Sequence, residues 1–385
     1  MLLIKNGKII TMAGVNIEKG CILVEKNKII DIAPNIDAPD GTTIIDAEGK
    51  MIFPGMIDAH CHLGLWEDAI GFEGADGNEM TDPVTPHLRS LDGINPMDRT
   101  FEEAYQGGIT AVATGPGSAN VIGGQFAAIK TFGRRIDEMI IAEPVAMKVA
   151  FGENPKRVYH EKKRSPMTRM ATAAILRETI MKAINYKNKK EEAKNDKSKQ
   201  PTFDFKLEAM LPVLEGKIPL KAHAHRADDI LTSIRIAKEF GLKITLEHCT
   251  EGHLIADYIS QEGCAAIVGP TLGDRSKFEL KNKDFETPAI LYKAGVKIAI
   301  MTDHPVIPVQ HLPMCAALAM KSGLPEEEAL KSITINAAEI LGLDDRIGSL
   351  EIGKDADIVI WNKHPLDLQA SVECTIIDGN IVYKK

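Results

Sequence analysis

The amino-acid sequence predicts an α/β protein, a (β/α)8 TIM-type barrel that carries a small β-sandwich. Short apolar runs rich in Val, Ile and Ala alternate with amphipathic stretches through the middle of the chain, a pattern typical of a parallel sheet covered by helices. Eight such runs match the strand number of the closed barrel. The chain of 385 residues is too long for one ordinary core but suits a large barrel with a smaller second domain. A doubly wound open sheet is the main alternative.

The two ends of the chain, residues 1–51 and 346–385, predict the sandwich. Short β-like runs near the N-terminus, such as Ile22–Glu25, are separated by turn residues, and similar runs return at 374–383. Each end is too small to bury a core by itself, so we expect the two ends to pair. Residues 52–345 would then form the barrel.

The barrel elements alternate along the chain. The strand candidates are Met56–His62, Ile109–Thr114, Gln125–Lys130, Val145–Phe151, Leu220–His223, Lys243–His248, Ala265–Val268 and Val296–Thr302. The helix candidates are Asp98–Gln106, Met167–Asn185, Ile230–Phe240, Gly252–Gln261, Thr287–Lys293, Gln310–Ser322 and Pro325–Ile340. Most neighbouring strands therefore have a helix between them, as a barrel of this kind requires.

Three connecting segments have distinct compositions. Gly64–Pro96 follows the first strand candidate and is too long for a routine connection, so we expect it to form a wall of the pocket. Gly115–Gly124 is rich in glycine but lacks the Lys-Ser/Thr pair of a phosphate-binding loop, which favours a tight loop near the pocket floor. Tyr186–Lys206 is dominated by Lys, Glu, Asn and Asp, which favours a solvated helix end or a mobile loop.

The composition narrows the range of partners. A net charge of −8 and a pI near 5.8 argue against a nucleic-acid-binding surface, which is usually basic. The chain has no run of about 18 apolar residues and no signal-peptide pattern at its start. We therefore expect a cytoplasmic protein with a small-molecule substrate, no nucleic-acid or membrane partner, and homo-oligomer formation left open. The six cysteines lack the spacing of a zinc ribbon or a disulfide framework, so we expect them to be reduced.

Histidine and aspartate side chains gather at the ends of the predicted strands. His60 and His62 lie two residues apart, so on a strand they point to the same face. Neutral imidazole is the commonest protein ligand for borderline divalent metals. His223 ends the fifth strand candidate, His248 ends the sixth, and Asp303 follows the eighth. Because functional groups of such barrels collect at the carboxyl ends of the strands, these residues predict a metal site.

The same stretches resemble motifs of the metal-dependent amidohydrolase superfamily, and the resemblance covers nearly the whole chain. They are most similar to the branch that holds imidazolonepropionase-like and dipeptidase-like proteins. The motifs that carry the resemblance are Phe53-Pro54-Gly55-Met56-Ile57-Asp58-Ala59-His60-Cys61-His62, Ala222-His223-Ala224-His225-Arg226, Leu246-Glu247-His248-Cys249, Met301-Thr302-Asp303-His304 and Gly348-Ser349-Leu350-Glu351-Ile352-Gly353-Lys354-Asp355-Ala356-Asp357-Ile358-Val359. The first and last motifs are specific, and the middle ones are less so.

The resemblance implies one or two divalent ions, of which zinc is expected and manganese, iron or cobalt stay open. The implied metal ligands are His60, His62, Lys148, His223, His248 and Asp303. His223 and His248 would bind a second ion or share the first. Lys148 would bridge the ions as a carboxylated lysine. A lysine that simply reaches solvent is the other interpretation, with Glu143 and Glu153 as substitute carboxylates.

The chemistry implied is metal-assisted hydrolysis of a C–N bond in an amide, a cyclic amide or a small peptide. Asp303 is the expected general base, with His248 as the second catalytic residue. Substrate contacts are expected from His225, Arg226 and Arg275, because an arginine beside a strand end can hold a carboxylate through two hydrogen bonds; a plain loop histidine is the other interpretation of His225. An imidazolonepropionase or a deaminase is the alternative function. A non-catalytic scaffold is a third possibility, but such proteins typically lose the ligands that this sequence keeps.

Overall fold

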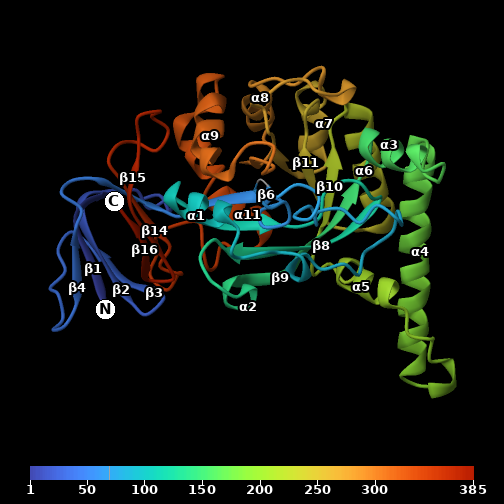
Figure 1. Cartoon of the computed structure of the whole chain (residues 1–385), viewed down its shortest axis with the longest axis horizontal. Coiled ribbons are helices and arrows are strands. Elements are labelled where there is room, and N and C mark those ends of the chain that lie inside the picture. Colours follow the sequence, from blue (N-terminus) through green and yellow to red (C-terminus); the bar gives the residue numbers. More distant parts are fainter. Residues whose placement is uncertain (69) are drawn as a thin grey trace.

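The computed structural model describes residues 1–68 and 70–385, which form a barrel and a smaller β domain (Figure 1). The barrel sheet has eight strands in the spatial order β13-β12-β11-β10-β9-β8-β7-β6. In chain order these are β6 (Met56–Cys61), β7 (Ile109–Thr114), β8 (Ile122–Lys130), β9 (Ile140–Ala150), β10 (Leu220–Ala224), β11 (Ile244–His248), β12 (Ala265–Val268) and β13 (Ile298–Ile300). All eight strands overlap the predicted runs, and the predicted barrel fold with a small β domain is confirmed.

Strand β8 departs from the parallel arrangement of a (β/α)8 barrel. It pairs antiparallel with both of its neighbours, β7 and β9, whereas the other neighbouring strands of the sheet pair in parallel. The link between β7 and β8, residues 115–121, is too short for the crossover of roughly a dozen residues that a parallel pair needs. The predicted alternation of strands and helices is therefore interrupted here.

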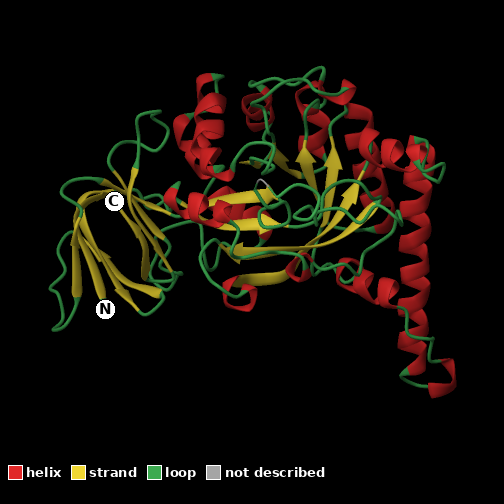
Figure 2. Ribbon diagram, viewed as in Figure 1, coloured by secondary structure: helices red, strands yellow, loops and turns green. Residues whose placement is uncertain are grey.

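Helices flank the barrel sheet (Figure 2). They are α1 (Arg99–Gln106), α2 (Ile136–Met139), α3 (Glu153–Glu161), α4 (Arg169–Ala193), α5 (Phe205–Leu214), α6 (Ala227–Phe240), α7 (Ala256–Gln261), α8 (Thr287–Lys293), α9 (Leu312–Lys321), α10 (Glu326–Lys331) and α11 (Ile335–Leu341). The predicted helix Pro325–Ile340 is divided into α10 and α11, and α2, α3 and α5 are additions to the predicted set. None of the helices in residues 1–68 and 70–385 is long and apolar enough to cross a membrane.

Helix α4 projects from the body of the molecule (Figure 1). Its last turns, from Tyr186 onward, fall in the segment predicted as a solvated helix end or mobile loop, and most of their side chains are at least partly exposed. Among the described residues of the segment Gly64–Pro96, the short 3-10 turn η1 (Ser90–Asp92) is the only named element. The side chains of Trp66 and Asn78 in this segment reach the main cavity of the barrel, as expected for a pocket wall.

The small β domain combines the two ends of the chain, and both termini lie in it (Figure 1). Its strands are β1 (Leu2–Ile9), β2 (Ile17–Glu25), β3 (Lys28–Ala33), β4 (Thr43–Asp46), β5 (Met51–Pro54), β14 (Ile358–Trp361), β15 (Val372–Ile377) and β16 (Asn380–Lys384). They form one sheet in the order β16-β15-β14-β5-β1-β2-β3, with β4 paired to β1. Ile4, Ile22, Ile358 and Ile376 are fully buried in one apolar core, so neither end of the chain buries this core alone.

A buried ion cluster connects the barrel with the β domain. Lys130, the last residue of β8, is 2% exposed. Its ammonium nitrogen lies 2.6 Å from Asp357 Oδ2, 3.1 Å from Asp355 Oδ2 and 3.2 Å from Asp378 Oδ1. Arg346 adds a second cation, with Nη2 2.8 Å from Asp355 Oδ2. Burial favours the neutral amine, but the three carboxylates outweigh it and raise the pKa of Lys130, so the cluster is held together by charge.

Candidate metal centre

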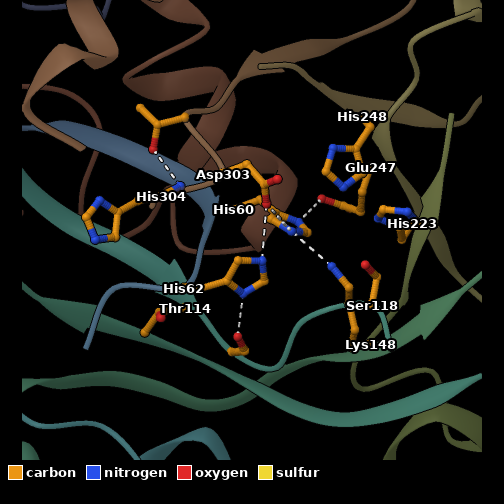
Figure 3. Close-up of polar contacts among 12 residues, drawn as sticks. His60, His62, Thr114, Ser118, Lys148, His223, Glu247, His248, Asp303 and His304 are labelled. Atoms are coloured by element: carbon orange, nitrogen blue, oxygen red, sulfur yellow. Dashed lines mark hydrogen bonds and ion pairs between the residues drawn. The ribbon is translucent and has the colours of Figure 1, made fainter. Parts of the chain in front are cut away.

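The first group of potential metal ligands consists of His60, His62 and Asp303 (Figure 3). His60 lies in β6, His62 follows directly after it, and Asp303 follows β13, the strand at the other end of the sheet. Asp303 Oδ1 is 3.1 Å from His62 Nε2 and 3.6 Å from His60 Nε2. The first and eighth strands of the barrel therefore bring together the three residues that the sequence predicted for one ion.

The second group consists of His223, His225 and His248. His223 is in β10, His225 directly follows that strand, and His248 ends β11. One ring nitrogen from each of the three lies within 4.8 Å of the other two. His225, which the sequence suggested as a substrate contact or a loop histidine, is thus part of a three-imidazole group. The site has one more potential ligand than the sequence predicted.

Hydrogen bonds to the Nδ1 atoms orient the imidazoles. His62 Nδ1 donates to the carbonyl of Gly115 over 2.7 Å, and His248 Nδ1 donates to the carbonyl of Gly269 over 2.9 Å. His60 Nδ1 lies 2.6 Å from Glu247 Oε2. Because a carbonyl or a carboxylate can only accept, the proton sits on Nδ1 and the Nε2 lone pair is free to bind a metal. This orientation fits the donor set that a divalent ion such as zinc requires.

The protonation states of the site also suit metal ligands. Burial lowers the pKa values of His60, His223 and His225 well below the ordinary value of histidine, and it lowers that of His248 to about 3. Burial alone would raise the pKa of Asp303, but the neighbouring His248 and His62 lower it to about 2. At neutral pH these four imidazoles are therefore neutral and the Asp303 carboxylate is ionised, the forms that bind cations.

Lys148 lies at the base of the site, close to His60 (Figure 3). Its side chain is fully buried, and Nζ is 2.9 Å from His60 Nε2. Burial lowers the pKa of Lys148 to about 7. The side chain therefore does not reach solvent, which was the other interpretation of this residue. Of the two substitute carboxylates, Glu143 binds Arg89 through its Oε1 over 2.7 Å, and Glu153 begins α3.

A cavity of about 430 Å³ opens over both ligand groups. Its lining includes His62, His223, His225, His248 and Asp303. Its remaining wall is partly polar, with Asn78, Ser118, Asn154, Lys277 and Lys283, and partly apolar, with Trp66, Leu272, Leu280, Val306 and Ile307. Ser118 and Gly117 come from the glycine-rich segment predicted near the pocket floor.

The two arginines predicted as substrate contacts are absent from the described lining of this cavity. Arg226 donates from Nε and Nη2 to the carboxylate of Asp228, two residues away. Arg275 donates from Nη2 to the backbone carbonyl of Lys283 over 2.8 Å. Each guanidinium is thus hydrogen-bonded to a residue close to it in sequence. The positively charged groups that line the cavity are instead Lys277 and Lys283.

Several residues of the site were not predicted. Glu247 orients His60 although it precedes His248 in sequence, where strand alternation would put the two side chains on opposite faces. His248 has a left-handed backbone, with φ of 70°. This turn at the strand end allows the side chains of both Glu247 and His248 to face the site. Asn154, Lys277 and Glu279 come from segments outside the strands, and no sequence spacing indicated them.

Comparison with known proteins defines the class. The model of the amidohydrolase family matches residues 51–382. A crystal structure of an amidohydrolase from Thermotoga maritima MSB8 superposes with a TM-score of 0.97 at 48% identity, covering 100% of both chains. The amidohydrolase tasK of Hapsidospora irregularis is 30% identical over 96% of this chain, which spans only 39% of that protein's length. The 5'-deoxyadenosine deaminase of Methanobrevibacter smithii is 23% identical over 99% of this chain and 88% of its own.

The chain therefore belongs to the amidohydrolase family, as the resemblance in its sequence indicated. It is a hydrolase of that superfamily acting on carbon–nitrogen bonds.

Proposed function

We propose that this protein hydrolyses the C–N bond of a small amide with the help of one or two divalent ions, of which zinc fits the donor set best. The observation that carries the proposal is the arrangement of two three-ligand groups, His60–His62–Asp303 and His223–His225–His248, at the same cavity. A divalent ion bound there would lower the pKa of a water molecule and polarise the scissile carbonyl. An imidazole and carboxylate site of this kind suits zinc, cobalt or manganese.

Asp303 is proposed as the general base. Its carboxylate is ionised at neutral pH because the pKa is about 2, and it borders the cavity. From this position it would accept a proton from the attacking water and return it to the leaving nitrogen, so that the amine departs neutral. His248 also borders the cavity and is neutral, with a pKa of about 3. Its Nδ1 proton is donated to the carbonyl of Gly269, so its Nε2 would serve as a ligand of the ion or as a proton acceptor.

Lys148 is proposed to carry a carboxyl group. Its amine would attack carbon dioxide, form an N–C bond and release one proton, which yields a carbamate with two oxygen donors. The lowered pKa of about 7 supports this step because only the neutral amine is nucleophilic. The position of Nζ, 2.9 Å from His60 Nε2, supports a role as a bridge between the two ligand groups.

The cavity supports a small substrate with unlike ends. Asn154 and Lys277 lie on the polar wall and suit a charged or hydrogen-bonding end, whereas Trp66 and Ile307 on the apolar wall suit a hydrocarbon group. The volume of about 430 Å³ is within the ordinary range for small-molecule sites. Dipeptides, N-acyl amino acids and cyclic amides such as hydantoins and lactams have this form.

The test joins elemental analysis with a substrate screen. Protein purified without chelators is expected to hold divalent metal and to hydrolyse the C–N bond of at least one member of a panel of dipeptides, N-acyl amino acids, hydantoins and lactams, with the products identified by mass spectrometry. 5'-Deoxyadenosine and imidazolonepropionate are included because the alternative function is a deaminase or an imidazolonepropionase. Turnover of one of these two compounds alone would replace amide hydrolysis by the alternative. Protein that binds no metal and turns over nothing would revive the scaffold interpretation.

A further inference from the structure

Glu279 is a buried carboxylate next to the second ligand group. It lies in the 3-10 turn η4 (Phe278–Leu280) and is 1% exposed. Its Oε2 accepts a hydrogen bond from the backbone N–H of Glu153 over 3.0 Å. Its Oε1 is 3.7 Å from His225 Nε2 and 4.0 Å from His223 Nε2, and it has no hydrogen-bond partner of acceptable geometry among the described residues. One oxygen is thus anchored and the other faces the imidazoles.

These distances fit a shared ion. Zinc binds imidazole nitrogen at about 2.0–2.1 Å and carboxylate oxygen at about 2.0–2.2 Å, so two ligands of one ion are never more than roughly 4.3 Å apart. Both separations, 3.7 Å and 4.0 Å, are below this limit, so an ion between the atoms could touch all three residues without a large movement.

Lys277 occupies the other side of the same oxygen. Its Nζ is 2.7 Å from Glu279 Oε1 and 3.1 Å from Asn154 Oδ1. We propose that Glu279 is a ligand of the ion held by His223, His225 and His248, and that the ammonium of Lys277 competes with this ion for Glu279. The proposal rests on the metal centre proposed above. Asn154 gives Lys277 a second partner, so the ammonium stays bonded when the carboxylate turns to the ion.

The alternative is that Glu279 serves only as the counterion of Lys277. The two ideas differ in what happens when both charges are removed. A ligand is missing from Glu279→Gln whether or not Lys277 is present, so metal affinity stays low in the double variant. A counterion acts only through the charge of Lys277, so the double variant would regain the affinity of the parent protein. A double-mutant cycle separates the two ideas.

The experiment uses the full chain stripped of metal with a chelator and titrated with Zn²⁺ by calorimetry. Glu279→Gln is expected to weaken one class of site by about 100-fold, at or above the range seen when groups that merely support metal ligands are lost. Lys277→Met is expected to tighten the same class, because it removes the competitor. The double variant is expected to stay weak. Recovery of parental affinity in the double variant overturns the proposal.

Two further measurements keep the result unambiguous. Co²⁺ replaces Zn²⁺ in a second titration, where the loss of a ligand changes the visible absorption spectrum of the bound ion. Glu251→Gln is the matched control. Glu251 is also buried, but it accepts hydrogen bonds from the Ala227 N–H and the Asn282 side chain. The Glu251→Gln variant is expected to bind Zn²⁺ with the affinity of the parent protein. If Glu279→Gln fails to fold, Lys277→Met alone decides, and unchanged or weaker binding in it contradicts the proposal.

The failure of the metal centre would look different from the failure of this inference. A parent protein that binds no Zn²⁺ removes the basis of the proposed function. A parent protein that binds Zn²⁺ with an affinity that Glu279→Gln does not alter leaves the function intact and removes only the role of Glu279.

Discussion

Two buried lysines in adjacent strands of the barrel have opposite surroundings. Lys130 in β8 is 2% exposed and Lys148 in β9 is 0% exposed. Lys130 has three carboxylates within 3.2 Å, which outweigh burial and raise its pKa. Lys148 has His60 Nε2 at 2.9 Å and forms none of the ion pairs found among the described residues; burial lowers its pKa to about 7.

The difference separates a structural use of a buried charge from a functional one. A buried ammonium with several anionic partners is stabilised in its charged form, and it ties together the segments that supply those partners. A buried ammonium without such partners is driven toward the neutral amine, which is reactive but contributes little to folding. Lys130 therefore acts as a clamp between the barrel and the β domain, whereas Lys148 has the surroundings expected of the reactive group proposed above.

The largest effect is expected when the charge of the metal centre is changed without loss of packing. Asp303→Asn keeps the shape of the side chain but removes the proton acceptor and one anionic ligand. We expect kcat/KM on the best substrate of the screen to fall by about 1000-fold, within the range for a lost general base, with little change in melting temperature. Steady-state kinetics and thermal melting of the same preparation measure both quantities.

Asp274→Asn is the control for that variant, because Asp274 also lines the cavity but is exposed. Its kcat/KM is expected to stay within a few-fold of the parent protein. Near-normal turnover in Asp303→Asn would remove Asp303 from the catalytic machinery.

The next effect is expected on stability, at the clamp. Lys130→Met leaves Asp355, Asp357 and Asp378 close together without their central cation. Removing one partner of a buried ion pair costs about 3–5 kcal/mol of unfolding free energy. The midpoint of urea unfolding is therefore expected to fall markedly, while the folded enzyme keeps its kcat/KM.

Lys28→Met tests whether burial is the reason. Lys28 Nζ is 2.7 Å from Asp355 Oδ1, but its side chain is 40% exposed. Asp355 is buried but keeps Lys130 and Arg346 as partners in this variant. A partly exposed cation contributes only about 0.2–1 kcal/mol, so this variant is expected to lose far less stability. Equal losses in the two variants would mean that burial does not distinguish the clamp from a surface pair.

The metal centre was predictable from the sequence where strand geometry alone decides the position. His60 and His62 lie at the end of one strand, His223, His248 and Asp303 lie at the ends of three others, and strand ends meet at one face of a barrel. The residues around them follow other rules. Arg226 binds Asp228 within its own segment, which no spacing could distinguish from a substrate contact.

Long-range pairs were beyond the sequence for a similar reason. Lys130 meets Asp355 across 225 positions, which no local spacing shows. The antiparallel direction of β8, by contrast, follows from a link too short for a parallel crossover, although the predicted barrel was parallel. Glu279 reaches His225 from a 3-10 turn. The barrel and the ends of its strands follow from periodicity, whereas contacts between loops depend on how the whole chain closes.

A smaller effect is expected from the functional lysine, with the opposite sign for stability. Lys148→Met is expected to reduce kcat/KM by about 100-fold, comparable to the loss of a group that supports a metal ligand, and to retain less metal. In chelator-treated protein we expect unfolding to require about 1 kcal/mol more free energy, as often happens when a functional group without structural partners becomes apolar.

Lys221→Met is the matched control for Lys148→Met. Lys221 pairs with Lys148 across β9 and β10 and is equally buried. Its Nζ lies 2.9 Å from Glu247 Oε2 and donates to the carbonyl of Ala59, so its loss removes the buried cation beside Glu247 and the donor to Ala59. This variant is expected to lose stability. A loss of stability in both variants would contradict the view that Lys148 contributes little to folding.

The smallest effect concerns the pH dependence of the clamp. The folded pKa of Lys130 is raised above the ordinary lysine value of 10.5, so its contribution to stability is fully present below that value. As the pH rises above it, the unfolded chain releases the proton first and stability falls. The difference in unfolding free energy between the parent protein and Lys130→Met is therefore expected to stay constant from about pH 7 to 10 and to narrow above. A difference that grows with alkaline pH would show that Lys130 is not held in its charged form. Urea titrations of both proteins measure this difference in unfolding free energy. The ionic strength is kept fixed, because a change in salt would screen the exposed ion pairs but not the buried cluster.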